Sequence, residues 1–201
     1  GYVREDPRYV MARVALTAVL LDRFRATRDR AWLERADAQA RVAADQDPPT
    51  AEALRVLARI CRADGRIDEG IAALERAARF APGSARTQLE LGIALRDAGR
   101  YDEAEGALQR AINLRPGFAD GAIELGFLYY ENNRYDAAAN QFRLAAELAP
   151  LNVRAHNNLG GLMYFLERRA EAREAFEASL AAEPNADAYS QLGTMAFDEA
   201  D

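Results

Sequence analysis

Proline recurs in this sequence every 34 residues, at Pro48, Pro82, Pro116, Pro150 and Pro184. A fixed period of this length indicates a chain built from repeated supersecondary units rather than from one irregular core. Aligning the chain on these prolines brings further columns into phase, and small residues alternate with large ones at helical spacing. The columns are Leu57, Leu91, Leu125 and Leu159; Ala58, Gly92, Gly126 and Gly160; Gly70, Ala104, Ala138 and Ala172; Leu74, Leu108, Phe142 and Phe176; and Ala77, Ala111, Ala145 and Ser179.

Each repeat predicts two helices joined by a turn. Residues that tolerate a left-handed backbone mark the turns, namely Gly65, Gly99 and Asn133. N-cap residues precede three of the first helices, namely Thr50, Ser84 and Asn152. Phe118 takes this place in the third repeat and weakens the pattern there. Glycine inside a helix costs about 1 kcal/mol relative to alanine, so we expect the glycine column to lie where two helices approach closely.

These columns resemble the tetratricopeptide repeat, whose signature pairs leucine and glycine in the first helix with small-large-small columns in the second and a closing proline. The resemblance covers residues 51–186 as four consecutive units. It implies an all-α fold, a right-handed α-solenoid of stacked antiparallel helix pairs with a concave surface lined mainly by the first helices. It also implies a protein-interaction role with a protein or peptide partner.

We expect residues 1–201 to form a single solenoid. Residues 7–50 are predicted as a degenerate first helix pair with a long N-terminal helix, because its first helix fits the repeat only if about three residues are inserted around 28–33. The phase of that pair is carried by Leu20, Leu21, Phe24, Ala36, Ala40 and Ala43. Four full units are predicted at 51–84, 85–118, 119–152 and 153–185. Residues 186–201 are predicted as a partial unit or a capping helix.

Composition argues against several classes of function. All 26 basic residues are arginine, which excludes a phosphate-loop lysine, a Schiff-base enzyme and a kinase core. The net charge of −6 argues against nucleic acid as a partner. Cys61 and His156 are the single cysteine and histidine, and Cys61 falls in an apolar column as a buried filler. We therefore expect no enzyme activity, no cofactor and no metal site.

The apolar stretch 11–21 is shorter than the roughly 20 residues that span a bilayer. We interpret it as part of a soluble helix and expect no membrane insertion. The expected compartment is the cytoplasm, with the periplasm left open.

The predicted concave surface carries an apolar stripe with two interpretations. Ile123, Phe127 and Tyr130 follow an i, i+4, i+7 spacing, and Leu89 with Ile93 continues the stripe one repeat earlier. The stripe either pads contacts between helices or forms an exposed anchor patch for a partner.

Charged residues on the same surface also leave two interpretations open. Glu90 and Glu124 occupy equivalent positions in adjacent repeats with Asp120 nearby, whereas basic residues lie toward the N-terminal repeats. These basic residues are Arg55, Arg59 and Arg86. The charges are either solvated or form a bipolar groove that takes basic side chains of a partner in its middle.

Asn157 and Asn158 fall on the concave side of the fourth repeat. Asn158 resembles one rung of the asparagine ladder with which sugar-transferring members of the family hold a peptide backbone. The other rungs are replaced by Val56, Glu90 and Glu124, so the sequence does not predict a full ladder.

Three functional hypotheses follow. The leading one is a non-catalytic module that binds a peptide or protein segment in its concave groove. The second is a regulatory or substrate-docking segment of a larger enzyme, because the repeats loosely resemble those that follow bacterial serine/threonine kinase domains. The third is an architectural scaffold that self-associates through its C-terminal end, where a first helix is predicted without a second.

Overall fold

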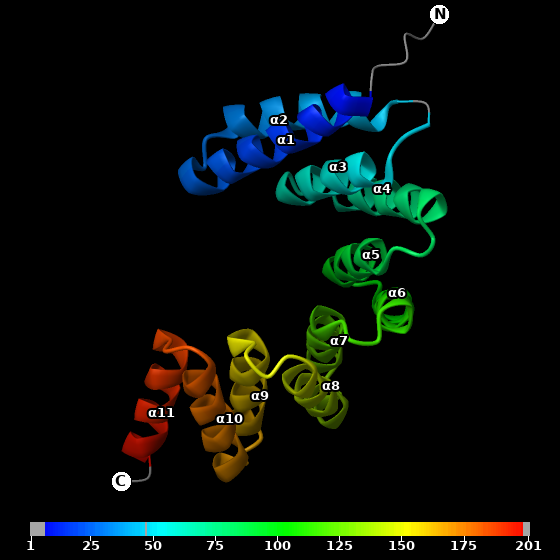
Figure 1. Ribbon diagram of the computed structural model, residues 1–201. Helices are drawn as coiled ribbons and strands as arrows, with labels where there is room; N and C mark the ends of the chain where they lie inside the picture. Colours follow the sequence, from blue (N-terminus) through cyan, green and yellow to red (C-terminus); the bar gives the residue numbers. More distant parts are fainter. Residues whose placement is uncertain (1–6, 47, 199–201) are drawn as a thin grey trace, which may run out of the picture. The chain divides into compact units, whose positions relative to one another are not determined.

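The computed structural model describes residues 7–46 and 48–198, and throughout this part of the chain the regular structure is α-helical, with eleven helices and no strand (Figure 1). The expected all-α fold is confirmed. The helices are α1 (Pro7–Thr27), α2 (Arg30–Ala44), α3 (Ala51–Ala63), α4 (Ile67–Phe80), α5 (Ala85–Asp97), α6 (Tyr101–Leu114), α7 (Ala119–Glu131), α8 (Tyr135–Leu148), α9 (Val153–Phe165), α10 (Arg169–Ala182) and α11 (Ala186–Asp198). None of the described helices is long and apolar enough to cross a lipid bilayer.

The helix pairs repeat with the period of the prolines. The helices α3, α5, α7 and α9 each have 13 residues, and their partners α4, α6, α8 and α10 each have 14. The first pair departs from this pattern because α1 has 21 residues. Its alanines Ala36, Ala40 and Ala43 are nevertheless fully buried, as the second-helix phase predicted.

The turns inside the pairs have the predicted left-handed backbone. The φ angle is +79° at Gly65, +74° at Gly99 and +58° at Asn133. Glu167 also has a positive φ, of +59°, which the sequence analysis missed because glutamate does not favour this region. A hydrogen bond from Arg168 N to Met163 O closes its turn, as equivalent bonds close the other three, so the six-residue closure imposes the conformation.

Side-chain caps start three of the first helices. Thr50 Oγ1 accepts from Ala53 N at 3.1 Å, Ser84 Oγ from Thr87 N at 3.2 Å, and Asn152 Oδ1 from Ala155 N at 3.2 Å. Phe118 makes no such bond before α7, in agreement with the weakened pattern there.

The glycine column lies at the closest approach of each pair. A Cβ atom at Gly92 would stand 2.6 Å from Leu108 Cγ, one at Gly126 would stand 2.5 Å from Phe142 Cε1, and one at Gly160 would stand 2.8 Å from Phe176 Cε1. A side chain at any of these positions would displace the large residue of the paired helix. The predicted close packing is therefore confirmed.

The chain divides into two compact units, residues 1–114 and residues 115–201. In unit 1, α1 packs against α2 and α3, and α2 to α5 each pack against the next helix. In unit 2, α7 to α11 pack in sequence and α11 also contacts α9. The expectation of one solenoid over residues 1–201 stays a prediction. The predicted segment 186–201 contains α11, and its residues 199–201 lie outside the described part.

Candidate functional site

In unit 1, charged residues that the sequence places on the concave surface form an ion pair with one another between neighbouring repeats. Arg55 donates to both carboxylate oxygens of Glu90, at 2.9 Å and 2.8 Å, and Arg86 adds a bond of 3.0 Å to the same carboxylate. The side chains of Arg55 and Glu90 are 15% and 14% exposed. Burial opposes ionisation of Glu90, but the two guanidinium groups lower its pKa below the ordinary value. Glu90 is thus neither solvated nor free for a basic ligand.

The apolar stripe of unit 1 is packed. Leu89 is 5% exposed, so the interpretation of this residue as an exposed anchor is wrong and the packing interpretation holds. Half-buried Ile93 and Arg59 line a cavity of about 50 Å³ together with Glu90. A space of this size holds a water molecule or two and is too small for a ligand side chain.

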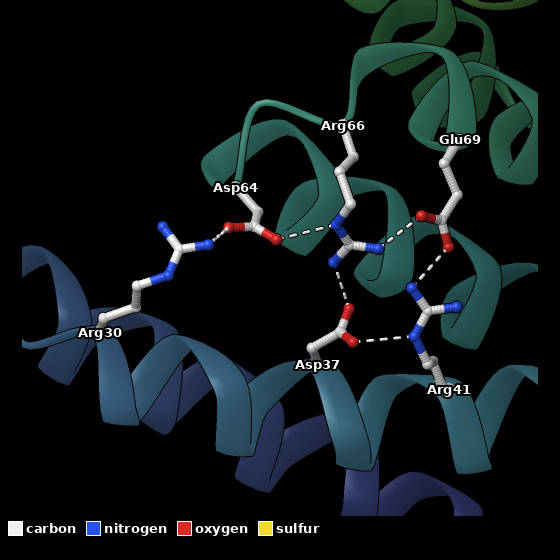
Figure 2. Close-up of polar contacts among 6 residues, drawn as sticks. All are labelled: Arg30, Asp37, Arg41, Asp64, Arg66 and Glu69. Atoms are coloured by element: carbon white, nitrogen blue, oxygen red, sulfur yellow. Dashed lines mark hydrogen bonds and ion pairs between the residues drawn. The ribbon is translucent and has the colours of Figure 1, made fainter.

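A second charged network in unit 1 joins the degenerate first pair to the following repeat (Figure 2). Arg66 donates to Asp37, to Asp64 at 2.8 Å and to Glu69 at 2.5 Å. Arg41 adds contacts to Asp37 at 2.8 Å and to Glu69 at 2.7 Å. Together with the pair Arg30–Asp64, at 2.6 Å, three arginines meet three carboxylates. The charges balance, so this cluster fastens helices together and offers no unpaired charge to a ligand.

In unit 2, the second acidic position is paired as well. Glu124 is 6% exposed and accepts a hydrogen bond of 2.5 Å from Arg154, whose guanidinium carbon also lies 5.5 Å from the centre of the Phe127 ring. Ile123 is fully buried, so the exposed-anchor interpretation is wrong for this residue too. Asp120 is half-buried at the start of α7. The bipolar groove is therefore not supported at Glu90 or Glu124, because both carboxylates are already bound within the fold.

A pocket of about 300 Å³ opens where α7, α8 and α9 meet. We call it the amide pocket. Its lining consists of Phe127, Tyr130, Phe142, Asn157, Asn158, Gly161 and Leu162. None of these residues is charged, and the volume lies at the lower end of the range for ligand pockets. The structure thus brings four of the predicted residues together in one cavity.

Two buried amide atoms in this pocket lack hydrogen-bond partners, Asn157 Oδ1 and Asn158 Nδ2. The other end of the Asn157 amide is fixed, because its Nδ2 donates to Asn185 Oδ1 at 3.1 Å. One unpaired acceptor and one unpaired donor therefore stand on consecutive residues of α9. Each costs about 1 to 3 kcal/mol while it stays buried and unpaired.

An aromatic cluster adjoins the amide pocket. The ring centres of Tyr130, Tyr135 and Phe165 lie 5.2 to 5.9 Å apart. Tyr130 is 40% and Phe165 54% exposed, and Tyr130 also lines the pocket. We call these three residues the aromatic shelf.

Sequence reasoning missed several members of this site. Phe142 had been assigned only to a structural column, and Gly161 and Leu162 carry no chemical signal of their own. Tyr135 is the first residue of α8 and Phe165 is the last residue of α9, and nothing in the repeat pattern indicates that their rings meet Tyr130.

The candidates for chemistry do not form a reactive site. Cys61 is fully buried, as predicted, and burial raises the pKa of its thiol to about 11. His156 lies 2.9 Å through Nε2 from the carbonyl oxygen of Pro150. Among the described residues, His, Cys, Asp and Glu side chains form no group of three that could hold a metal ion.

The helix period, the caps and the glycine contacts together define a tetratricopeptide repeat protein. Family models described as tetratricopeptide repeat match residues 51–94, 89–153 and 123–164, which together span more than half of the chain. The chain belongs to this family.

Solved structures agree with the fold. The chain is similar to MamA, with 25% identity and a TM-score of 0.66 over 79% of this chain and 92% of MamA. PilF of Pseudomonas aeruginosa gives 19% identity and a TM-score of 0.69, over 89% of this chain and 78% of PilF. YrrB gives 19% identity and a TM-score of 0.59, over 90% of each chain. A search of curated proteins found no match. In general terms, the family and these folds identify a protein-interaction module.

Proposed function

We propose that this protein holds an extended peptide segment of a partner in the amide pocket of unit 2. The observation that carries this proposal is the pair of unpaired buried amide atoms, Asn157 Oδ1 and Asn158 Nδ2. A peptide main chain offers both complementary groups, an N–H that donates to Asn157 Oδ1 and a C=O that accepts from Asn158 Nδ2. The partner thereby removes a desolvation cost that the free protein carries.

The surrounding residues favour a peptide over a small polar ligand. Phe127, Phe142 and Leu162 supply apolar walls for a side chain, and Gly161 leaves the entrance open because a Cβ there would meet no atom within 4 Å. The terminal torsion of asparagine is broad, so a small rotation turns the Asn158 amide toward a ligand, while the bond from Asn157 Nδ2 to Asn185 Oδ1 holds the Asn157 amide in place. YrrB, whose fold is similar, is described as a TPR protein with an unusual peptide-binding site, and this description supports a peptide as the ligand.

The paired carboxylates argue against a basic ligand. A lysine or arginine of the partner would have to displace Arg55 and Arg86 from Glu90, or Arg154 from Glu124, and would gain little by exchanging one guanidinium for another. We therefore place the peptide at the uncharged pocket and not along the acidic column.

The test uses the full chain on an array of random twelve-residue peptides. The wild type is compared with the double variant Asn157→Ala, Asn158→Ala. We expect the double variant to lose binding by about tenfold or more for most selected peptides, because each lost hydrogen bond in a buried site is worth about 1 kcal/mol.

Asn140→Ala serves as the matched control, because Asn140 is an exposed asparagine on α8 of the same unit outside the pocket. This variant should retain the wild-type peptides. Equal retention of the same peptides by the double variant and the control would refute the proposed site.

A further inference from the structure

The amide pocket and the aromatic shelf form one continuous surface, because Tyr130 belongs to both. Its ring lines the pocket and lies 5.7 Å from the ring of Tyr135 and 5.9 Å from the ring of Phe165. The three rings come from α7, α8 and α9, so packing within unit 2 assembles the shelf before any ligand arrives.

We infer that the partner segment is uncharged and carries proline, with its proline rings on the aromatic shelf and its neighbouring main chain on Asn157 and Asn158. This inference rests on the proposed function and specifies the class of peptide that the same site takes.

Charge is the first argument. The residues that line the pocket and form the shelf include no acidic or basic side chain. The guanidinium of Arg154 lies over the pocket residue Phe127 and is bound to Glu124. A charged side chain of the peptide would lose its hydration here without meeting an opposite charge.

Hydrogen bonding is the second argument. Among the buried side-chain atoms of the pocket, one unpaired acceptor, Asn157 Oδ1, faces a peptide N–H as its complementary group. The shelf presents aromatic rings, and the hydroxyl of Tyr135 is already committed as a donor to Asn133 at 2.6 Å. An ordinary residue that crosses the shelf would cover its own N–H against a ring, whereas proline has no N–H to leave unpaired.

Shape and entropy are the third argument. A proline-bearing segment favours the extended polyproline II conformation, which has no internal hydrogen bonds, so its carbonyl groups stay free to accept from Asn158 Nδ2. Such a segment is already ordered before it binds and loses less conformational freedom on an aromatic surface than a flexible chain does.

The test measures fluorescence anisotropy of two labelled octapeptides with the full chain. One probe is Pro-Pro-Leu-Pro-Pro-Leu-Pro-Pro, and the other has alanine in place of every proline and so restores the N–H groups. We expect the proline probe to bind at least tenfold more tightly. We expect Phe165→Ala to weaken it by about tenfold, because exposed aromatic anchors dominate such interfaces.

The matched control is Tyr189→Ala, which removes an aromatic ring that is 60% exposed on α11 of the same unit but outside the site. This variant should bind the proline probe as the wild type does. Equal binding of the two probes, no binding of the proline probe, or no effect of Phe165→Ala would overturn the inference.

The two proposals fail in different ways. If the alanine probe binds as tightly as the proline probe and Asn158→Ala weakens both, the peptide site stands and the preference for proline is wrong. If neither asparagine affects any peptide that the chain binds, the proposed function itself is wrong.

Discussion

Both units are built from the same kind of helix pair, but the side chains at equivalent positions of their first helices are bonded differently. At the fifth position of the first helix, unit 1 has Arg55 where unit 2 has Asn157. At the sixth position, Glu90 of unit 1 is matched by Asn158. Arg55 and Glu90 bind each other across 35 residues of sequence, whereas Asn157 and Asn158 of α9 leave an acceptor and a donor unpaired. The sixth position of α7 in unit 2, Glu124, is bound by Arg154.

The difference shows that the side chains, and not the backbone, decide whether the polar groups on a first helix are already bonded within the fold. In unit 1, charged side chains of neighbouring helices form ion pairs with one another, as in the network of Figure 2. Unit 2 keeps an uncharged pocket of about 300 Å³ beside exposed rings. Under the proposed function, a ligand gains more from unit 2, where it replaces no existing bond.

The largest expected effect tests whether packing is equivalent in the two units. Gly92→Leu in unit 1 and Gly126→Leu in unit 2 each drive a side chain into Leu108 or Phe142. Each variant should lose about 3 kcal/mol or more of unfolding free energy, measured by thermal circular dichroism. Gly161→Ala is the control. Its Cβ meets nothing within 4 Å, and the change should raise stability by about 0.5 to 1 kcal/mol. Unchanged melting of either leucine variant would contradict the packing.

The next effect concerns the charged network of unit 1 that is shown in Figure 2. Arg66→Met removes the guanidinium that binds Asp37, Asp64 and Glu69, and leaves three carboxylates without it. Because these side chains are partly exposed, we expect a loss of about 2 kcal/mol, seen as faster hydrogen exchange in α1 and α2. In unit 2, Arg143→Met breaks a single exposed pair with Glu171 at 3.4 Å and should change stability by less than about 0.5 kcal/mol.

The same experiment has a built-in reporter, because Cys61 is the single cysteine of the chain and lies fully buried in unit 1. With a pKa of about 11, its thiolate fraction at pH 8 is about one in a thousand, so alkylation should be slow in the folded wild type. Arg66→Met should accelerate it. An unchanged rate, together with unchanged exchange, would show that the network does not hold the first pair.

Lowering the pH should reduce the free energy of unfolding, because it protonates Glu90 in unit 1. Its folded pKa lies below the ordinary value of 4.5, so the stabilisation is fully present above about pH 4.5 and is lost as the pH falls through the folded pKa. Glu90→Gln should cost about 1 kcal/mol at pH 7 in urea unfolding, and the gap to wild type should narrow at pH 3. The exposed Glu177→Gln on α10 is the matched control and should follow the wild type at both pH values. A gap for Glu90→Gln that stays constant with pH would contradict the ion pair.

The sequence predicted the starts of three first helices because their capping signals are local. Thr50, Ser84 and Asn152 cap the helix that directly follows each of them, and the glycine column reports a contact that recurs with the period. The left-handed backbone of Glu167 was not predicted, because the closing hydrogen bond of the turn imposes it and the residue type does not favour it.

The candidate site was predicted only in part because its character depends on pairing between repeats. The residues Phe127, Tyr130, Asn157 and Asn158 were found from their place on the first helices. That Glu90 binds Arg55, and that Asn158 Nδ2 binds nothing, depends on side-chain directions across helices 30 or more residues apart. The period places such residues side by side but does not decide which of them meet.

The smallest expected effect separates a binding site from ordinary packing. Val56 stands at the equivalent position of Asn158 in the repeat 51–84 and is 4% exposed, so this position of the fold accepts an apolar side chain. Asn158→Ala removes a buried donor that has no partner, and unfolding in urea should therefore show no loss of stability or a gain of up to about 1 kcal/mol. A loss of more than about 1 kcal/mol would show that the amide is bound within the folded protein. The amide would then be a structural contact, as Glu90 is, and the contrast between the two units would disappear.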